Sequence, residues 1–536
     1  MKHKKPLPQE QQIKIRPDSE SSTDLYDSII FYPWKLMDMN ANVFMSSAEL
    51  IKAAQTYLNG IYSYYFNFMT PYWIALNSFL FMEKIKITQH RPDETLKDYL
   101  DLLHFNLQIT KKGHLSTLRT INDFHAQELA RAVSSWLNTI FDRDGEDITA
   151  YTERLSRLTE LLTYHYPQVI RDIEPEFGFH FDDGGYIKVD ETDRFYLYQV
   201  LPRDKKVKVR EKGKPIFIIP PYVLGASIVA FLPGENKSYT HCFANQGIPT
   251  YVRIMKDFND TPAVQIMTGE DDCHDTRQFC EVIKARHGRP VTLNGFCQGG
   301  FVALLNLLTG ELDNLVDAFI TCVTPIDGTR SKALIEYLEH IPERFRDLGY
   351  ALKALPNGNR VVDGKVMSWV YKLKSMDREA PVFTFYRDLI MFDKQNAKEI
   401  HITKTAAALN YWLIYERNDL PLAITQMSFD SYTKPVTGDG TLPVKLFGRK
   451  LNFKHLKDMG IKWLICYAEE DDLVDKESAL APLDFVDAEV TVFPKGHGAI
   501  ATSWSLPTSE CALHTRFGDG CRGPVCFQLD LDKGKK

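Results

Sequence analysis

Residues 291–308 of the chain read VTLNGFCQGGFVALLNLL, and this stretch decides the fold class. Its opening residues favour a β-strand, and from Phe301 onward apolar residues recur at helical spacing. Between the two lies Gly-x-Cys-x-Gly-Gly, with Cys297 at its centre. Glycine has no Cβ, so it permits a sharp turn and close approach of neighbouring backbones. We therefore predict a strand, a tight turn that carries Cys297, and a helix.

This arrangement resembles the nucleophile elbow of α/β-hydrolases, with cysteine in the usual place of serine. A simpler interpretation is that Cys297 is a small buried apolar residue at a glycine-rich strand end, a common environment for free cysteine. The rest of the chain distinguishes the two interpretations, because a nucleophile requires an acid and then a histidine after later strands.

The composition is that of an ordinary globular protein. The chain has 536 residues, which predicts more than one domain, and a net charge of −6, which argues against a nucleic-acid partner. Its nine cysteines are scattered, with no Cys-x-x-Cys pair and no apolar leader before them. We therefore expect a cytoplasmic protein with reduced thiols, no metal and no cofactor.

Changes in sequence pattern divide the chain into four parts. We predict a disordered tail over 1–24, a helical domain over 25–177, an α/β catalytic domain over 178–515 and a C-terminal tail over 516–536. After Ser505 the chain is expected to be loop-like, with its last residues disordered. A helix-rich insertion at about 327–441 interrupts the catalytic domain and is expected to cover the site as a cap.

Within the helical domain, residues 53–82 carry no charge and many aromatic side chains. Ser46, with Glu49 behind it, is typical of a helix start, and Pro71 is expected to break or kink the helix that follows. Three interpretations of the aromatic run stay open: a buried or subunit-contact helix, contact with an apolar surface, and a membrane span.

Strands and helices alternate from residue 186 onward, which predicts a mainly parallel sheet. The predicted strands are 186–189, 195–200, 215–219, 247–254, the strand before Cys297, 318–323, 462–468 and 489–493. His497 follows the last of them, and an acidic run at 470–472 follows the strand before it.

Nucleophilic cysteine chemistry needs a base and a group that orients the base. The chain provides them in the order expected of an α/β-hydrolase. We predict Cys297 as the nucleophile and His497 as the general base. The acid is predicted to be Asp471, with Asp472 as the alternative.

An oxyanion hole in this fold uses the backbone N–H that follows the nucleophile, here that of Gln298. A second N–H must come from the loop after an earlier strand. Pro220 and Pro221 have no N–H, so either Tyr222 or Val223 must donate.

Several motifs resemble those of polyhydroxyalkanoate synthases, over about residues 185–504. They are Gly-x-Cys-x-Gly-Gly at 295–300, the double proline after a strand at 218–221, the strand 195–202, the segment 444–453, Glu-Asp-x-x-Val at 470–474 and Gly-His at 496–497. The resemblance places the family's catalytic aspartate at Asp471 and its histidine at His497. Asp472 stands where that family has histidine, and the residues after the double proline also differ.

The resemblance implies that Cys297 takes a (R)-3-hydroxyacyl group from a coenzyme A thioester and that the acyl units are joined into a polyester. Asp471 then either orients His497 or activates the attacking hydroxyl. The implied partners are 3-hydroxyacyl-CoA, a polyester chain or granule surface, and a second copy of the chain in a homodimer. A cysteine thioesterase or esterase of the same fold, and a granule-binding protein without catalysis, are the alternatives.

Overall fold

The structure is a computed structural model that describes residues 23–86, 92–223, 225–339, 341, 346, 348–370, 381–393 and 402–534. Most of the tail predicted over 1–24 lies outside these residues. The described chain divides into two compact units. The first contains residues up to 58 together with 125–160, and the second contains 59–124 together with 161 onward.

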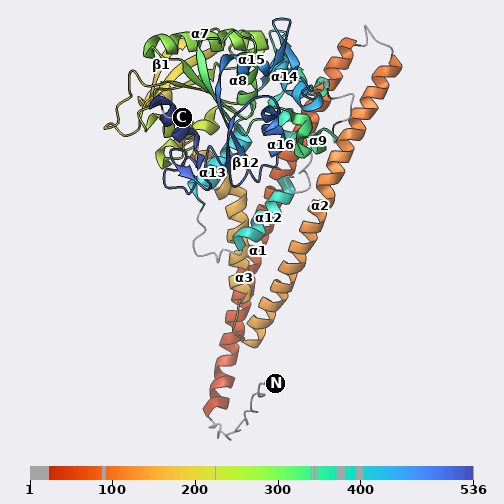
Figure 1. Ribbon diagram of the computed structural model, residues 1–536. Coiled ribbons are helices and arrows are strands. Elements are labelled where there is room, and N and C mark those ends of the chain that lie inside the picture. Colours follow the sequence, from red (N-terminus) through yellow and green to blue (C-terminus); the bar gives the residue numbers. More distant parts are fainter. Residues whose placement is uncertain are drawn as a thin grey trace, which may run out of the picture. The chain divides into compact units, whose positions relative to one another are not determined.

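The N-terminal part is helical, as expected. Its helices are α1 (Thr23–Lys86), α2 (Pro92–Phe141), α3 (Ile148–Glu160) and α4 (Tyr166–Asp172), with a π-helical turn at Leu161–His165 (Figure 1). Of the break or kink expected at Pro71, the break does not occur, because α1 continues through it. A proline removes one backbone hydrogen bond, and a helix of 64 residues keeps its other bonds. Among the described helices, none is long and apolar enough to cross a membrane.

The helix start predicted at Ser46 is also wrong, since Ser46 lies inside α1. Its hydroxyl lies 3.4 Å from that of Thr149, and Ser156 donates a hydrogen bond of 3.2 Å to Glu49. Lys52 forms an ion pair of 2.6 Å with Glu160. The polar residues that resemble a cap therefore join α1 to α3 within the first unit.

The aromatic run at 53–82 is part of α1 and has two kinds of surface. Phe79 is buried in the main apolar cluster of the second unit. Tyr62, Phe66 and Trp73 are 68%, 61% and 58% exposed. The run therefore buries one side of the helix and leaves large aromatic side chains on its surface.

The second unit is built on an eight-stranded sheet in the order β1-β2-β4-β3-β5-β6-β12-β13. The strands are β1 (Tyr186–Glu191), β2 (Phe195–Val200), β3 (Ile216–Ile219), β4 (Thr250–Met255), β5 (Val291–Phe296), β6 (Val316–Cys322), β12 (Lys462–Ala468) and β13 (Glu489–Phe493). Strand β2 is antiparallel to both of its neighbours, and the strands from β4 to β13 are parallel.

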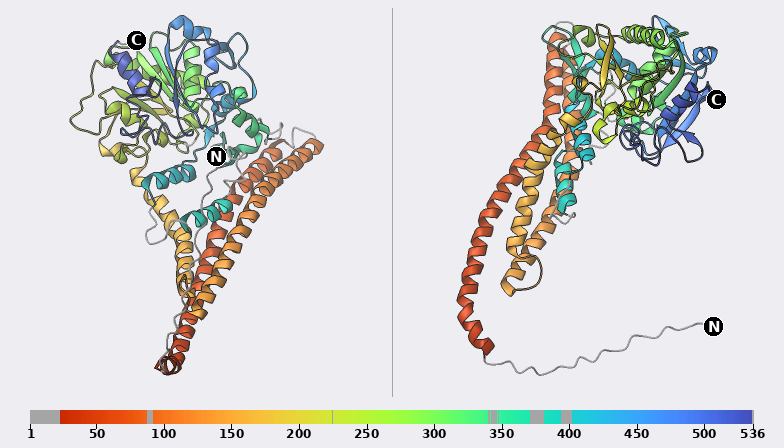
Figure 2. Two further views of the ribbon diagram at one scale, coloured as in Figure 1. Left: turned by 60° about the horizontal axis from the view of Figure 1, so that its bottom comes forward. Right: turned by 90° about the vertical axis from the view of Figure 1, so that its left-hand side faces the viewer.

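Alternate residues of the central strands face opposite sides of the sheet. In β3, Phe217 and Ile219 join a cluster with α7 (Gly269–His287) and α8 (Gln298–Leu308). Ile216 and Ile218 join a second cluster with α5 (Tyr239–Ala244) and α17 (Pro524–Asp532). Because both faces are covered, the sheet is buried between layers of helices (Figures 1 and 2).

This arrangement is the α/β-hydrolase fold, which confirms the predicted fold class. The sheet is mainly parallel, and the strand–turn–helix motif lies at its centre, where β5 is followed by α8.

The insertion between β6 and β12 is helix-rich and carries a small three-stranded sheet in the order β7-β8-β9. Its elements are α9 (Lys332–Glu339), β7 (Leu352–Ala354), β8 (Arg360–Val362), α10 (Gly364–Val370), α12 (Pro381–Asp393), α13 (Lys404–Tyr415), β9 (Leu420–Pro421) and α14 (Leu422–Thr433). The remaining short elements are α6 (Pro262–Gln265), β10 (Thr441–Leu446), β11 (Arg449–Asn452), α15 (Lys454–Met459) and α16 (Lys476–Ala479).

The tail predicted to be loop-like over 516–536 is ordered up to residue 534. It forms the hairpin of β14 (Arg516–Phe517) and β15 (Cys521–Arg522), followed by helix α17. Val525 and Phe527 are buried against the sheet. The prediction failed because α17 is a short helix of nine residues, and packing against the sheet stabilises it.

Candidate active site

Cys297 occupies a strained backbone position between β5 and α8. Its φ is 52° and its ψ is −126°, which is rare for a residue with a side chain. The N–H of Cys297 donates to the carbonyl of Cys322 at 2.8 Å, and the N–H of Gly300 donates back to the carbonyl of Cys297 at 2.9 Å. These two bonds hold the turn in place.

Close contacts around the turn explain the three glycines. A Cβ at Gly295 would lie 2.5 Å from the backbone nitrogen of Gly300, and one at Gly299 would lie 2.6 Å from the carbonyl oxygen of Pro220. A Cβ at Gly300 would overlap the side chain of Thr324. The Gly-x-Cys-x-Gly-Gly pattern is therefore required by packing between β5, α8 and the loop after β3.

Asp471 and His497 come together after adjacent parallel strands, β12 and β13. The Nδ1 of His497 lies 2.8 Å from Oδ2 of Asp471. The other carboxylate oxygen of Asp471 accepts the N–H groups of Leu473 and Val474, at 2.9 and 2.8 Å. Asp471 is buried, whereas Asp472 is exposed. The geometry therefore brings Asp471, and not Asp472, to the histidine.

His497 lies between this carboxylate and the thiol of Cys297. Burial by itself lowers the pKa of His497, but its interactions with Asp471 and Cys297 outweigh it and raise the pKa well above 6.5. Because Nδ1 is used by Asp471, Nε2 is the ring nitrogen left for Cys297. The arrangement favours an imidazolium next to the sulfur, and that form can give its proton to a departing group.

Gln298 and Val223 meet beside the elbow. As the first residue of α8, Gln298 has a backbone N–H without an acceptor inside the helix. Its side-chain oxygen accepts the N–H of Val223 at 3.2 Å, and its side-chain nitrogen donates to Ser428 of α14 at 2.8 Å. The inserted helix α14 therefore contacts the residue next to the nucleophile.

A cavity of about 600 Å³ adjoins the loop after β3. Pro221 and Tyr222 of that loop line it, together with Lys353 and Arg417 of the insertion. Cys297 and its two partners are not among the lining residues. The insertion and the loop that was predicted to carry the second oxyanion donor therefore line the same cavity.

The structure also shows polar residues that the sequence did not single out: Arg253 and Asp272 bond to Tyr222 of this loop, and Ser428 bonds to Gln298. No local motif marks them, because each is separated from the loop by at least 31 residues. Within the residues that the structure describes, no group of three or more histidine, cysteine or acidic side chains is placed to hold a metal ion.

No protein-family model matches the chain, and no curated protein matches it either. Solved structures do match, at low similarity. A carboxylesterase of the thaumarchaeon Nitrososphaera gargenis is 14% identical, with 59% of this chain and 92% of that chain covered and a TM-score of 0.34. Carboxylesterase CesB of Bacillus subtilis is 10% identical, with 63% and 92% covered and a TM-score of 0.34. A putative aryl esterase of Burkholderia cenocepacia is 13% identical, with 65% and 97% covered and a TM-score of 0.30. At these scores the fold assignment rests on the chain's own sheet order and elbow.

Proposed function

We propose that the protein is an acyl-transfer enzyme that carries its acyl group as a thioester on Cys297. The observation that carries this proposal is the elbow itself: Cys297 stands on a strained turn next to His497, and Asp471 holds the imidazole. An elbow with a base and an orienting acid is the arrangement that activates a nucleophile in this fold.

In the first step, the sulfur of Cys297 attacks the carbonyl carbon of an ester or thioester. The carbonyl oxygen becomes an oxyanion, which backbone N–H groups near Gln298 stabilise. The bond to the leaving group then breaks, and the leaving thiolate or alkoxide takes the proton of the His497 imidazolium. A thioester donor, such as a coenzyme A thioester, is close in energy to the acyl-cysteine, so this transfer is reversible.

In the second step, an acceptor hydroxyl attacks the acyl-cysteine. His497 takes the proton of that hydroxyl, the new C–O bond forms, and the C–S bond breaks to return the thiolate of Cys297. For this step we propose the hydroxyl of a 3-hydroxyacyl unit, so that repeated transfer builds a polyester. The motifs shared with polyhydroxyalkanoate synthases, including Asp471 in the acid position, support this acceptor.

Water is the second candidate acceptor, which would make the protein a cysteine thioesterase or esterase. The α/β-hydrolase fold favours it, because the same elbow in this fold hydrolyses esters and lipids. The two functions share every residue of the first step and differ only in the product of the second.

Intact-protein mass spectrometry with 3-hydroxybutyryl-CoA tests the first step. We expect wild-type protein to gain the mass of one or more acyl units and Cys297→Ala to gain none. Cys526→Ala is the matched control, since Cys526 is another partly exposed free cysteine, and it should acylate normally. An adduct that persists in Cys297→Ala, or a wild-type mass that never changes, would contradict the proposal.

The product of the same reaction identifies the acceptor. Coenzyme A release with polymer in the pellet supports transfer to a hydroxyl. Coenzyme A release with only free 3-hydroxybutyrate in solution supports hydrolysis.

A further inference from the structure

The loop after β3 leaves open which residue donates the second N–H to an oxyanion. The N–H of Val223 already donates to the side-chain oxygen of Gln298 at 3.2 Å. Gln298 is in turn held by its 2.8 Å bond to the hydroxyl of Ser428, and both side chains are buried. A backbone N–H can donate only one hydrogen, so the N–H of Val223 is not available to an oxyanion while this bond is made.

The N–H of Tyr222, by contrast, has no acceptor among the described residues. Tyr222 directly follows the double proline, next to the loop carbonyls against which Gly299 packs. An oxyanion hole requires a backbone N–H that donates to no other group and lies near the start of α8, as this one does.

The side chain of Tyr222 is anchored in a fully buried polar network. Its hydroxyl donates to the carboxylate of Asp272 on α7 and accepts from the guanidinium of Arg253 on β4 at 3.1 Å. Arg253 and Asp272 form an ion pair of 2.7 Å, with 2% and 0% of their side chains exposed. Burial raises the pKa of Tyr222 well above 10, so the phenol keeps the proton that it donates.

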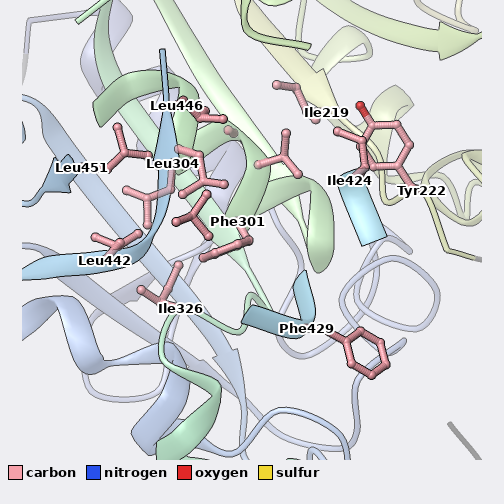
Figure 3. Close-up of a cluster of buried hydrophobic side chains, with 14 of the residues drawn as sticks. Ile219, Tyr222, Phe301, Leu304, Ile326, Ile424, Phe429, Leu442, Leu446 and Leu451 are labelled. Atoms are coloured by element: carbon pink, nitrogen blue, oxygen red, sulfur yellow. The ribbon is translucent and has the colours of Figure 1, made fainter. Parts of the chain in front are cut away.

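Two further side chains contribute hydrogen bonds to this network. Asn306 of α8 donates to Asp272 at 2.7 Å, and Arg253 donates to Thr276 at 2.9 Å. The network thus ties the loop to β4, to α7 and to α8, the helix that begins next to the nucleophile. Tyr222 also belongs to the apolar cluster that contains α8 and α14 side chains (Figure 3).

Such a network is poorly explained by stability alone. Taking a guanidinium and a carboxylate out of water is costly, and a buried ion pair is often no more stabilising than apolar side chains of the same size. What a buried network of hydrogen bonds provides is a single, rigid geometry. Here the network fixes the position of the loop after β3, which packs against the elbow.

We propose that Tyr222 provides the second oxyanion donor through its backbone N–H, and that Arg253 and Asp272 are positioning residues that hold it in place through its phenol. On the opposite side, Gln298 and Ser428 fix the next peptide unit by engaging the N–H of Val223. This inference rests on the proposed acyl transfer at Cys297 and names the groups that stabilise its tetrahedral intermediate.

The test compares two reactions of the same sulfur in the full-length chain. Acylation by 3-hydroxybutyryl-CoA passes through an oxyanion, whereas alkylation of Cys297 by iodoacetamide does not. Tyr222→Phe removes the anchoring hydroxyl and keeps the ring. We expect it to lower the rate of acylation by tenfold or more, with KM and the alkylation rate within about twofold of wild type, since losing one oxyanion donor costs about 10²–10³ in kcat.

Tyr251→Phe is the matched control. Tyr251 lies on the same strand as Arg253, and its buried hydroxyl lies 2.7 Å from His287, away from the loop. This variant should acylate and alkylate as wild type does. Ser428→Ala, which releases Gln298 from the other side, should lower acylation by a smaller factor and leave alkylation unchanged.

Wild-type acylation by Tyr222→Phe would overturn this inference while the proposed function stands. Parallel losses of acylation and alkylation in both Tyr222→Phe and Ser428→Ala would also overturn it, because they would show general damage to the site. A wild-type chain that forms no acyl-enzyme refutes the proposed function, and this inference with it.

Discussion

Substitution of Gly299 by alanine tests directly whether packing at the elbow sets the position of the nucleophile. Gly299 is the second residue of α8, and its Cα faces the loop after β3. An added Cβ would lie 2.6 Å from the carbonyl oxygen of Pro220 and also too close to that of Ile219. Ordinary contact begins near 3.4 Å, and both obstacles are backbone atoms that cannot rotate away.

The closer of the two clashes, with the carbonyl oxygen of Ile219, requires α8 and the loop to separate by about 1 Å. Overpacking of this kind costs about 1–3 kcal/mol. Alanine is favoured over glycine in a helix by up to about 1 kcal/mol, which offsets part of that cost. We therefore expect the free energy of unfolding of the second unit to fall by about 1–2 kcal/mol.

The effect on catalysis should be larger than the effect on stability. The separation moves the N–H of Gln298 away from the loop that carries the second donor, and a misplacement of about 1 Å can cost about 10²-fold in rate. We expect Gly299→Ala to lower the acylation rate of Cys297 by about 10–100-fold while the protein remains folded.

Two assays measure these effects: urea unfolding followed by tryptophan fluorescence, and the burst of thiol release from 3-hydroxybutyryl-CoA. Gly438→Ala is the control, since Gly438 has an ordinary φ and a Cβ there would meet no atom within 4 Å. If Gly299→Ala matched this control in both stability and acylation rate, the reasoning from close packing would be refuted.

Two further predictions concern charge. Asp471→Asn should lower the acylation rate by about 10³–10⁴-fold, because an amide no longer favours the required tautomer and charge of His497, whereas Asp472→Asn should change it little. Equal losses in the two variants would contradict the assignment of the acid. The second prediction concerns His241, whose pKa is lowered from 6.5 to about 4 by burial and by the charge of Arg203. Between pH 6.5 and 4 only the unfolded chain takes up this proton, so stability is fully present above pH 6.5 and falls by about 3 kcal/mol as the pH drops to 4. Urea unfolding of wild type and His241→Asn across this range should show a shallower acid dependence in the variant, and identical curves would refute the prediction.

Much of the catalytic fold could be predicted from the sequence because its signals are local. Short runs of apolar, β-favouring residues such as Ile216–Ile219 marked the strands, and the glycines around Cys297 marked a tight turn with no room for a side chain at those positions. The order of Cys297, an acidic run and His497 follows from the chain direction of parallel strands, whose carboxyl ends meet at one edge of the sheet.

The predictions that failed concern residues whose partners are distant in the sequence. Ser46 resembles a helix cap in sequence, but it lies inside α1. Its side chain contacts Thr149 of α3 instead of capping a helix start. Pro71 has the character of a helix breaker, yet one missing hydrogen bond does not end a helix of this length. Val525 and Phe527 lie in a short helix near the end of the sequence, and only the sheet beneath them makes α17 a part of the core.

The sequence by itself determined that this chain has a cysteine elbow in a mainly parallel sheet, because glycine sterics and strand periodicity act between neighbours in the chain. Only the tertiary structure shows that Asp471 rather than Asp472 reaches His497, since the two differ in which way the turn after β12 directs them. It also brought Arg253 and Asp272 to Tyr222, and Ser428 to Gln298. Hydrogen bonds between residues 19 to 130 positions apart depend on how strands and helices pack, and no local pattern in the sequence records that packing.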